Sequence, residues 1–555
     1  MTIAVLGVLV VVGLVLRVVC YTGLGATDSL GYIGAAAQLG QGQFPWENYP
    51  AAYASVGLIV PIVPFVMLGG YTSWLPTIFS LMCGVALIPL TYWLARQCET
   101  VSTGLWAAFV AASSTLAIGS SMKVLPDTPL ALWSSLAIAL VVCARGKPSP
   151  RAVFLFCLAA GVALGIACTT KLTAVFVFPV LWLAIVPMSG KRLSAIAGGC
   201  TGLFLVLLAF LGFWTVVTGD PWDGFRCAFS GTALTDPDAP LPPRHSLWAF
   251  PIKMFLVISH DGLFYYFLVP AVLWGLARRR RQLWLPLAWV GIVFACLQFG
   301  SSSVSSYRPF PHNARYLMLL LPAGAVIIGS ALAHLTTHRP RCAFALACGY
   351  ATVCCSFAFL QAATAPLDLP AATTAIHYLT EHPPRAVFTD APFAPIFNFA
   401  LQDYQGNMPE AEVWLDEHLA IVASPLQDDG SVVIRFDERI IRRQVTAGNY
   451  EPIDIDTPYE WLDEHAQKTV IALDHARLRR AALMPIAAVI RRLPLPGALA
   501  TRLDATMSRH TAPRTIILYF VRPTPRNWQT DRNAIPAPAL VPDRSSLLHT
   551  NTRAD

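Results

Sequence analysis

The feature that most limits how this chain can fold is a series of long, uninterrupted apolar runs. Each is roughly 17 to 25 residues long, the length at which an α-helix crosses about 30 Å of hydrocarbon. Of the 555 residues, 55% are hydrophobic and 13% are charged, whereas soluble domains carry about 25% charged residues. We therefore predict an α-helical polytopic membrane protein with about 11 transmembrane helices. The predicted spans are residues 3–22, 73–95, 103–121, 128–144, 152–170, 172–188, 193–217, 255–276, 283–300, 316–333 and 342–361.

Basic residues gather in short loops at every second crossing. These loops contain Arg96, residues 145–151, Lys191 with Arg192, residues 278–281, and Arg339 with Arg341. Because cytoplasmic loops are rich in Lys and Arg, this pattern predicts a cytoplasmic N-terminus in a multi-pass protein of the cytoplasmic (inner) membrane. The loops after every odd-numbered span then lie on the outer face. The net charge of +7 follows from the same loops, so it does not indicate nucleic-acid binding.

A further apolar segment, residues 51–70, is long enough to suggest a twelfth span. A crossing there would invert every later loop and place the arginine clusters outside. Pro61 and Pro64 also interrupt its helical potential. We predict an interfacial or re-entrant element on the outer face, and the sequence does not separate these two alternatives.

After residue 361 the composition changes to that of a soluble domain. Short strand-like runs at residues 386–388, 431–436, 469–473 and 515–521 alternate with helical stretches, which predicts a small α/β domain at residues 362–522. The topology places this C-terminal domain in the periplasm or outside the cell. Residues 481–503 are expected to form an amphipathic helix, and residues 523–555 a tail without regular structure. Residues 1–361 form the transmembrane domain.

Polar residues cluster where spans 1, 3, 5 and 9 reach the outer face, so four loops are expected to converge on one cavity. Ionisable residues at the edge of the hydrocarbon are costly unless they are paired, hydrated or functional. Structural alternatives remain for some of them, because Asp127 could cap the following helix and Arg315 could extend to lipid headgroups. The candidate residues are Asp28, Tyr32, Lys123, Asp127, Lys171, His312, Arg315 and Tyr316.

In their order along the chain these residues belong to motifs that resemble GT-C glycosyltransferases, in particular the protein O-mannosyltransferase and aminoarabinose-transferase group. The resemblance covers roughly residues 1–360. In the first loop Ser29 stands where the family often has a second acidic residue, and no family motif is found in the C-terminal domain. The motifs are Arg17 with residues 27–32 (TDSLGY), residues 123–130 (KVLPDTPL), residues 165–171, and residues 312–316 (HNARY).

The resemblance implies an inverting glycosyltransferase that moves a sugar from a polyprenyl-phosphate donor to a lipid, glycan or protein acceptor on the outer face. Asp28 is expected to be the base that takes the acceptor proton, and Lys171 and Arg315 to hold the lipid phosphate. Asp127 would orient the donor sugar or Lys123, and His312 would donate to the phosphate. Tyr32 and Tyr316 complete the expected substrate-binding set.

No metal is expected to be obligatory, because Asp28, Asp127 and His312 lack a compact ligand spacing, although a divalent metal stays an alternative. Nearly all 13 cysteines lie in spans, which predicts neither a disulfide framework nor a Cys-based zinc site. The main rival function is a polytopic lipid or glycan transporter or flippase. Transporters usually have two similar halves with broken helices near the midplane, whereas the charges of this chain gather at one face. Two further rival functions are a lipid-glycan ligase or polymerase and a noncatalytic scaffold.

Overall fold

The computed structural model describes residues 2–21, 28–42, 55–70, 74–226, 263–300, 314–364 and 375–376, together with five strands between residues 386 and 521. The chain divides into two compact units. The first comprises Met1–Leu369 and Arg479–Thr511, and the second comprises Pro370–Leu478 and Ala512–Asp555. The predicted amphipathic helix at residues 481–503 and the predicted tail at 523–555 lie outside the described residues.

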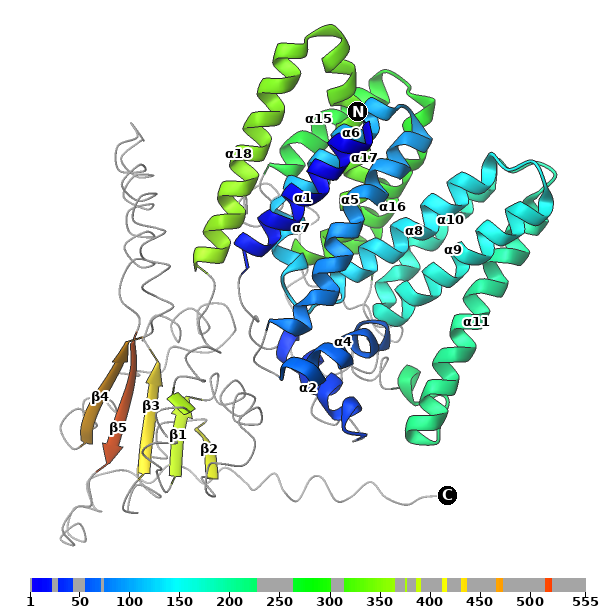
Figure 1. The fold of residues 1–555 in the computed structure, drawn as a ribbon. Helices are drawn as coiled ribbons and strands as arrows, with labels where there is room; N and C mark the ends of the chain where they lie inside the picture. The colour runs from blue at the N-terminus through cyan, green and yellow to red at the C-terminus, as the bar shows by residue number, and fades with distance from the viewer. Residues whose placement is uncertain are drawn as a thin grey trace, which may run out of the picture. The chain divides into compact units, whose positions relative to one another are not determined.

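The described part of the first unit is helical (Figure 1). Short 3-10 helices lead into several of the α-helices: η1 (Leu75–Thr77), η2 (Leu172–Val177), η3 (Arg281–Leu283) and η4 (Ala314–Leu320). The α-helices are α1 (Thr2–Val19), α2 (Asp28–Gly40), α4 (Val56–Gly69), α5 (Ile78–Cys98), α6 (Val101–Ser113), α7 (Thr115–Ser121), α8 (Asp127–Arg145), α9 (Pro150–Thr170), α10 (Phe178–Ile185), α11 (Arg192–Thr218), α15 (Phe264–Ala277), α16 (Trp284–Phe299), α17 (Leu321–His338) and α18 (Pro340–Thr364).

The described helices confirm a helical multi-pass membrane protein. Eight of them are long and apolar enough to cross a bilayer, and the bent pair α6 and α7 raises the number to nine within the described residues. The predicted spans 172–188 and 255–276 correspond to the segments Leu172–Ile185 and Phe264–Ala277, which are shorter apolar helices. A total of about 11 crossings therefore stays a prediction.

The structure corrects the predicted span 103–121, which is not one continuous helix. Helix α6 ends at Ser113, helix α7 begins at Thr115, and the two axes differ by 56°. Ser114 between them has extended backbone, with φ −64° and ψ 126°. Helix α7 leads directly into the turn that carries Lys123 and the start of α8.

Helix α4 occupies most of the ambiguous segment 51–70. Its 14 residues contain Pro61 and Pro64, and it is too short to meet the length of a span. Because Leu172–Ile185 and Phe264–Ala277 are equally short, length does not separate α4 from a crossing, and an interfacial or re-entrant element stays a prediction. Helix α4 packs against α2 and against the end of α9. At that contact a Cβ on Gly57 would lie 2.5 Å from the Thr170 hydroxyl, so only glycine fits the observed approach.

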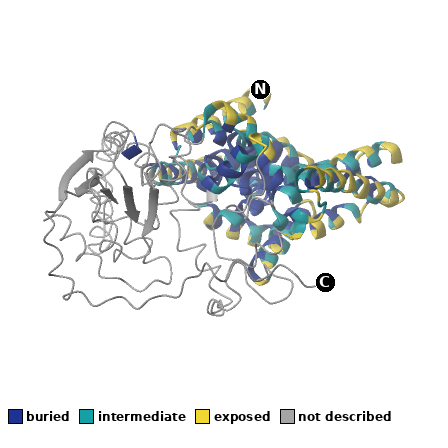
Figure 2. Ribbon diagram, turned by 90° about the horizontal axis from the view of Figure 1, so that it is seen from below, coloured by how far each residue is buried: buried dark blue, intermediate teal, exposed yellow. Residues whose placement is uncertain are grey.

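The interior of the first unit is formed mainly by α8 and α17. Within their apolar windows, 72% of the α8 span and 83% of the span ending in α17 are buried, against 11% for α1 and 17% for α11. Figure 2 shows the buried residues gathered in the middle of the helical bundle. The exposed apolar side chains of α1 and α11 are the ones that lipid would cover.

Helices α9 and α11 approach one another through glycines. A Cβ on Gly202 would lie 2.1 Å from the Leu158 carbonyl oxygen, and a Cβ on Gly161 would lie 2.1 Å from that of Gly199. Small residues allow transmembrane helices to pack at short range, where backbone contacts replace side-chain contacts. This packing fixes the position of α9, whose C-terminal end carries Lys171.

The second unit contains a five-stranded sheet in the order β2-β1-β3-β5-β4. Strands β1, β2 and β3 pair in parallel, with Val387 opposite Val413 and Val432. Strand β5 is antiparallel to both β3 and β4. The segments that connect the strands lie outside the described residues, so the α/β class of this domain stays a prediction. The strands are β1 (Ala386–Asp390), β2 (Glu412–Asp416), β3 (Ser431–Phe436), β4 (Ala466–Ala472) and β5 (Thr515–Val521).

Candidate functional site

The candidate site is organised around Asp127, the first residue of α8. Its side chain is buried, with 1% of its surface exposed. The preceding residue, Pro126, occupies the N-cap position and makes no side-chain cap hydrogen bond. The carboxylate instead accepts a hydrogen bond from Lys171 Nζ, with 2.6 Å between Nζ and Oδ1. Asp127 therefore points towards a cation from another helix and is not mainly a helix cap.

Arg315 brings a second cation to the same carboxylate. Its Nε lies 3.8 Å from Asp127 Oδ2, which is an ion-pair distance and too long for a hydrogen bond. Arg315 belongs to η4, the 3-10 helix before α17. Its side chain is 26% exposed and that of Lys171 is 17% exposed, so both cations are only partly covered. Arg315 thus faces Asp127, which is a different role from simple extension to lipid headgroups.

Tyr316 forms one wall of this cluster. Lys171 Nζ lies 3.9 Å from the centroid of its ring, and the Arg315 guanidinium carbon lies 5.6 Å from the same centroid. A cation over an aromatic face is attracted by the ring quadrupole. The ring and the Asp127 carboxylate together contact the ammonium group of Lys171.

Lys123 adds a third cation. It lies in the turn between α7 and α8, where the Leu125 amide donates to the Lys123 carbonyl oxygen at 2.9 Å. Burial, and then the positive charge of Arg315, lower the pKa of Lys123 below its ordinary value. Lys171 and Arg315 therefore pair with the Asp127 carboxylate, and Lys123 lies close to Arg315, so the four groups together have a formal excess of two positive charges. Such a site is suited to an anion with several oxygen atoms, such as a phosphate group.

Two of the predicted site residues, Asp28 and His312, are not fully described by the structure, whereas Tyr32 is. Asp28 begins α2, and Tyr32 lies in its second turn; the Asp28 side chain is outside the described residues. His312 is outside them too. Helix α2 packs against α4, and α4 packs against α9 beside Lys171. The described loops around Lys123, Lys171 and Arg315 thus converge as predicted, whereas the roles of Asp28 and His312 stay predictions.

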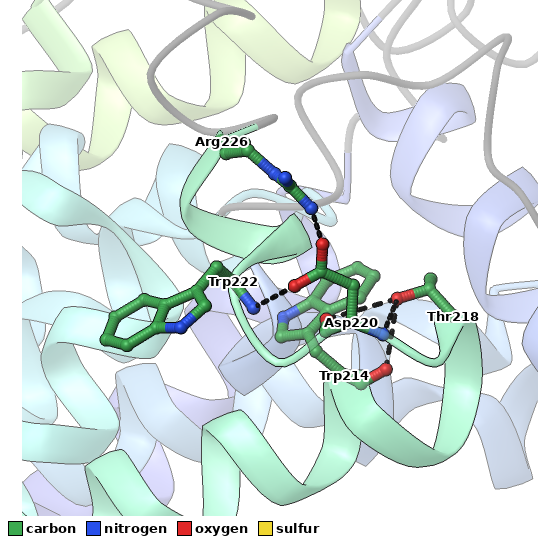
Figure 3. Close-up of polar contacts among 5 residues, drawn as sticks. All are labelled: Trp214, Thr218, Asp220, Trp222 and Arg226. Atoms are coloured by element: carbon green, nitrogen blue, oxygen red, sulfur yellow. Dashed lines mark hydrogen bonds and ion pairs between the residues drawn. The ribbon is translucent and has the colours of Figure 1, made fainter. Parts of the chain in front are cut away.

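The C-terminal end of α11 forms a compact polar turn (Figure 3). Asp220 pairs with Arg226 and accepts a hydrogen bond from the Trp222 amide at 2.8 Å. Gly219 has φ +80°, the left-handed conformation that commonly ends a helix. Trp222 is 57% exposed, as expected for an aromatic anchor at a membrane boundary. This turn explains how α11 ends, and the contacts drawn in Figure 3 do not involve Asp127, Lys171 or Arg315.

Sequence reasoning missed two features near the site. The first is the break between α6 and α7, which hydropathy alone does not reveal. The second is the partner set of Arg17, which the sequence analysis noted only as part of a motif. A lone arginine inside an apolar run was the available signal, because a buried charge in a membrane segment requires partners.

Among the described residues no group of three His, Cys, Asp or Glu side chains is arranged to hold a metal ion. Of the three possible metal ligands named from the sequence, Asp127 is the one whose side chain is described, and it pairs with Lys171 and Arg315. Metal dependence therefore stays a prediction.

A protein-family model matches part of the helical unit. The family described as dolichyl-phosphate-mannose-protein mannosyltransferase matches residues 51–216, the segment that includes Lys123, Asp127 and Lys171. No curated protein matches the chain at the sequence level.

Solved structures of membrane glycosyltransferases share the fold over most of their length. ArnT from Cupriavidus metallidurans in the apo state is similar with a TM-score of 0.55 and 15% identity, over 92% of this chain and 97% of that one. ArnT bound to undecaprenyl phosphate gives a TM-score of 0.55 and 14% identity, over 80% and 95% of the two chains. The archaeal oligosaccharyltransferase AglB from Archaeoglobus fulgidus, in complex with an inhibitory peptide and a dolichol-phosphate, gives 0.51 and 11%, over 94% and 88%. The chain therefore has the fold of the GT-C superfamily of membrane glycosyltransferases.

Proposed function

We propose that this protein is an inverting glycosyltransferase that uses a polyprenyl-phosphate sugar as donor. The observation that carries the proposal is the pairing of Lys171 and Arg315 with the buried carboxylate of Asp127, with Lys123 beside Arg315. Its excess positive charge is suited to a lipid phosphate. The similar fold of ArnT with undecaprenyl phosphate and of AglB with a dolichol-phosphate supports a lipid-linked donor.

In the proposed reaction Asp28 takes the proton of the acceptor hydroxyl, and the acceptor oxygen forms a bond to the anomeric carbon of the sugar. The bond between that carbon and the phosphate oxygen breaks, and polyprenyl phosphate leaves with the electron pair. A single displacement inverts the anomeric configuration. Lys171 and Arg315 stabilise the charge that develops on the leaving phosphate, which is the contribution expected to lower the barrier most.

The remaining residues would position the substrates. Asp127 holds Lys171 and Arg315 in place and, through the following turn of α8, sets one wall of the site. Tyr316, with Lys171 over its ring, and Tyr32 would contact the donor, and His312 would donate to the phosphate. The acceptor is a lipid, a glycan or a protein, and the site would open at the outer face of the cytoplasmic membrane.

Replacement of Asp28 by Asn tests the proposal. It preserves the size of the side chain and removes the base, so turnover should fall roughly 10²- to 10⁴-fold while the lipid donor still binds. The purified protein would be assayed in lipid nanodiscs with polyprenyl-phosphate sugars, and product stereochemistry would be measured by NMR spectroscopy. Asp220→Asn is the matched control, because Asp220 is a carboxylate of the α11 turn outside the Asp127 cluster.

Normal turnover of the Asp28→Asn protein would remove this residue from the mechanism. If the wild-type protein moves a lipid-linked sugar between leaflets without cleaving it, a transporter function replaces the transferase.

A further inference from the structure

Arg17 is the one described arginine whose entire side chain is enclosed within the helical unit. It lies near the end of α1, a helix whose other side chains are mostly exposed, and its exposed fraction is 0%. Among the described residues its guanidinium pairs with no carboxylate. A charge of this kind inside a membrane segment is expensive unless its N–H groups are satisfied, and it usually has a function.

The partners of Arg17 lie on both sides of the break between α6 and α7. On α6, its Nη2 donates to the Ala111 carbonyl at 3.4 Å, and its Nη1 donates to the Ala112 carbonyl at 3.3 Å. On α7, its Nε donates to the Ser121 hydroxyl at 3.3 Å. A fourth hydrogen bond, from Nη1 to the Gly13 carbonyl at 2.8 Å, fixes the side chain against its own helix.

These contacts provide hydrogen-bond donors for the carbonyl groups that the break in the helix leaves without a partner. The carbonyl groups in the last turn of a helix have no intrahelical donor, and in a bilayer no water is present to replace it. The guanidinium provides these donors in a fixed planar arrangement, which a lysine could not reproduce. Arg17 therefore stabilises the 56° bend that separates α6 from α7.

The bend between α6 and α7 sets the position of the turn that carries Lys123. Ser121 is the last residue of α7, and Lys123 follows after one residue. The turn then closes through the Leu125 amide, and α8 starts with Asp127. Helix α5 packs against the same two side chains, since a Cβ on Gly84 would lie 2.0 Å from the Ser121 hydroxyl and 3.3 Å from Arg17 Nε. The end of α7 therefore has little freedom to move.

We infer that Arg17 is a positioning residue for the proposed transfer: through the bend of α6 and α7 it places Lys123 to bind the lipid phosphate and Asp127 to hold Lys171 and Arg315. The inference rests on the proposed function for its kinetic consequence. Its structural consequence, the placement of the turn at residues 122–126, does not depend on which substrate is used.

The kinetic test compares Arg17→Met and Arg17→Lys in the full-length protein, with turnover expressed per folded molecule. A displacement of about 1 Å in a positioned group can cost about 10²-fold in rate, so Arg17→Met should lower kcat/KM for the lipid donor roughly 10- to 100-fold. The KM for the acceptor should not change. Arg17→Lys keeps the positive charge but loses the planar guanidinium group, so its kcat/KM should lie between those of Arg17→Met and the wild type. Val15→Met, on the exposed side of the same helix, is the matched control.

A second measurement is independent of activity. Leu125 is buried, with 6% of its surface exposed, so a Leu125→Cys thiol should react slowly with a soluble maleimide. Adding Arg17→Met should make the labelling at this position at least severalfold faster, as measured by mass spectrometry of the peptide. Ser121→Ala removes only one hydrogen-bond acceptor of Arg17, so it should increase the labelling rate by less. This variant replaces Arg17→Met in the test if Arg17→Met does not fold.

The outcomes are distinguishable. If Arg17→Met folds with wild-type kcat/KM and unchanged labelling of the cysteine at 125, the inference is overturned. If labelling increases but the wild-type protein uses no polyprenyl-phosphate sugar, the proposed function fails and the role of Arg17 in placing the turn stands. If only the yield of folded protein falls, with normal kinetics and labelling in the folded fraction, Arg17 is merely structural and the inference is also overturned.

Discussion

Two carboxylates, Glu99 and Asp127, lie at opposite ends of the broken span formed by α6 and α7, and their partners differ in kind. Glu99 Oε2 accepts hydrogen bonds from the hydroxyl groups of Thr103 and Ser330, the first at 3.0 Å. Asp127 accepts from Lys171 and faces Arg315. The first carboxylate joins helices through neutral groups, whereas the second is surrounded by cations.

The basic residues at the two ends of the broken span also differ in the kind of partner that they contact. At the end that contains Glu99, Arg145 donates to the Ala184 carbonyl at 2.8 Å, and Lys191 donates to the Lys147 carbonyl at 2.6 Å. These basic groups satisfy carbonyl groups at helix ends, which is a structural role. The cations around Asp127 converge on one carboxylate and remain partly exposed. The basic residues at the two ends of this span therefore differ in their partners: carbonyl groups at one end, and a shared carboxylate at the other.

The largest effect that separates the two ends is expected from their carboxylates. Asp127→Asn releases Lys171 and Arg315 from their common partner, and we expect turnover to fall by roughly 10²-fold through their misplacement. Glu99→Gln should leave turnover close to wild type and lower the free energy of unfolding by about 1 kcal/mol, because it changes hydrogen bonds to hydroxyl groups. Turnover per folded molecule and thermal unfolding of both proteins would be compared. Equal losses of turnover would show that the two ends are not functionally distinct.

The second comparison concerns the lysines. Lys171→Ala should weaken apparent donor affinity by about 1.5–3 kcal/mol, the contribution of a hydrogen bond to a charged group, which is roughly 10- to 150-fold. Lys191→Ala, at the other end, removes a contact to a carbonyl and should not change donor affinity. Titration of the purified proteins with a lipid donor measures both. Unchanged affinity in folded Lys171→Ala protein would reject its assignment to the phosphate.

Glycine substitutions test whether the surroundings of Lys171 are rigid. Gly57→Ala places a Cβ 2.5 Å from the Thr170 hydroxyl, next to Lys171, whereas a Cβ on Gly212 meets nothing within 4 Å. Overpacking of this kind costs about 1–3 kcal/mol, so Gly57→Ala should lower the thermal unfolding temperature and weaken donor binding. Gly212→Ala should leave both close to wild type. If Gly57→Ala lowered stability but left donor binding intact, α4 would not support the site.

The smallest effect is expected from the protonation of Lys123. Its lowered pKa means that the unfolded chain binds this proton more tightly than the folded protein does, so between the two pKa values stability rises with pH. Donor binding should show the opposite trend, because it weakens as pH rises through the folded pKa and the phosphate loses one cation. The apparent donor affinity would be measured at increasing alkaline pH in the wild type and in Lys123→Met. A wild-type loss that persists unchanged in Lys123→Met would assign the titration to another group.

The amino-acid sequence by itself determined where the apolar helices lie and which polar residues stand at their ends. The reason is local. Each span must form its own backbone hydrogen bonds and be long enough to cross the hydrocarbon, and basic residues are enriched in the cytoplasmic loops. Every predicted span therefore overlaps a described helix or pair of helices, and those at 172–188 and 255–276 overlap helices shorter than a span. The strand-like runs of the C-terminal part likewise lie where the five-stranded sheet has its strands β1, β3, β4 and β5, whereas β2 was not anticipated.

Only the tertiary structure decided which of the polar residues act together. The pairing of Asp127 with Lys171 and Arg315 joins segments far apart in the sequence, and its geometry depends on how α8, α9 and η4 pack. The break at Ser114 also escaped prediction, because the donors that make it stable come from Arg17 on another helix. Span positions depend on local hydrophobicity, whereas a charged cluster depends on long-range packing that brings its members within a few ångströms.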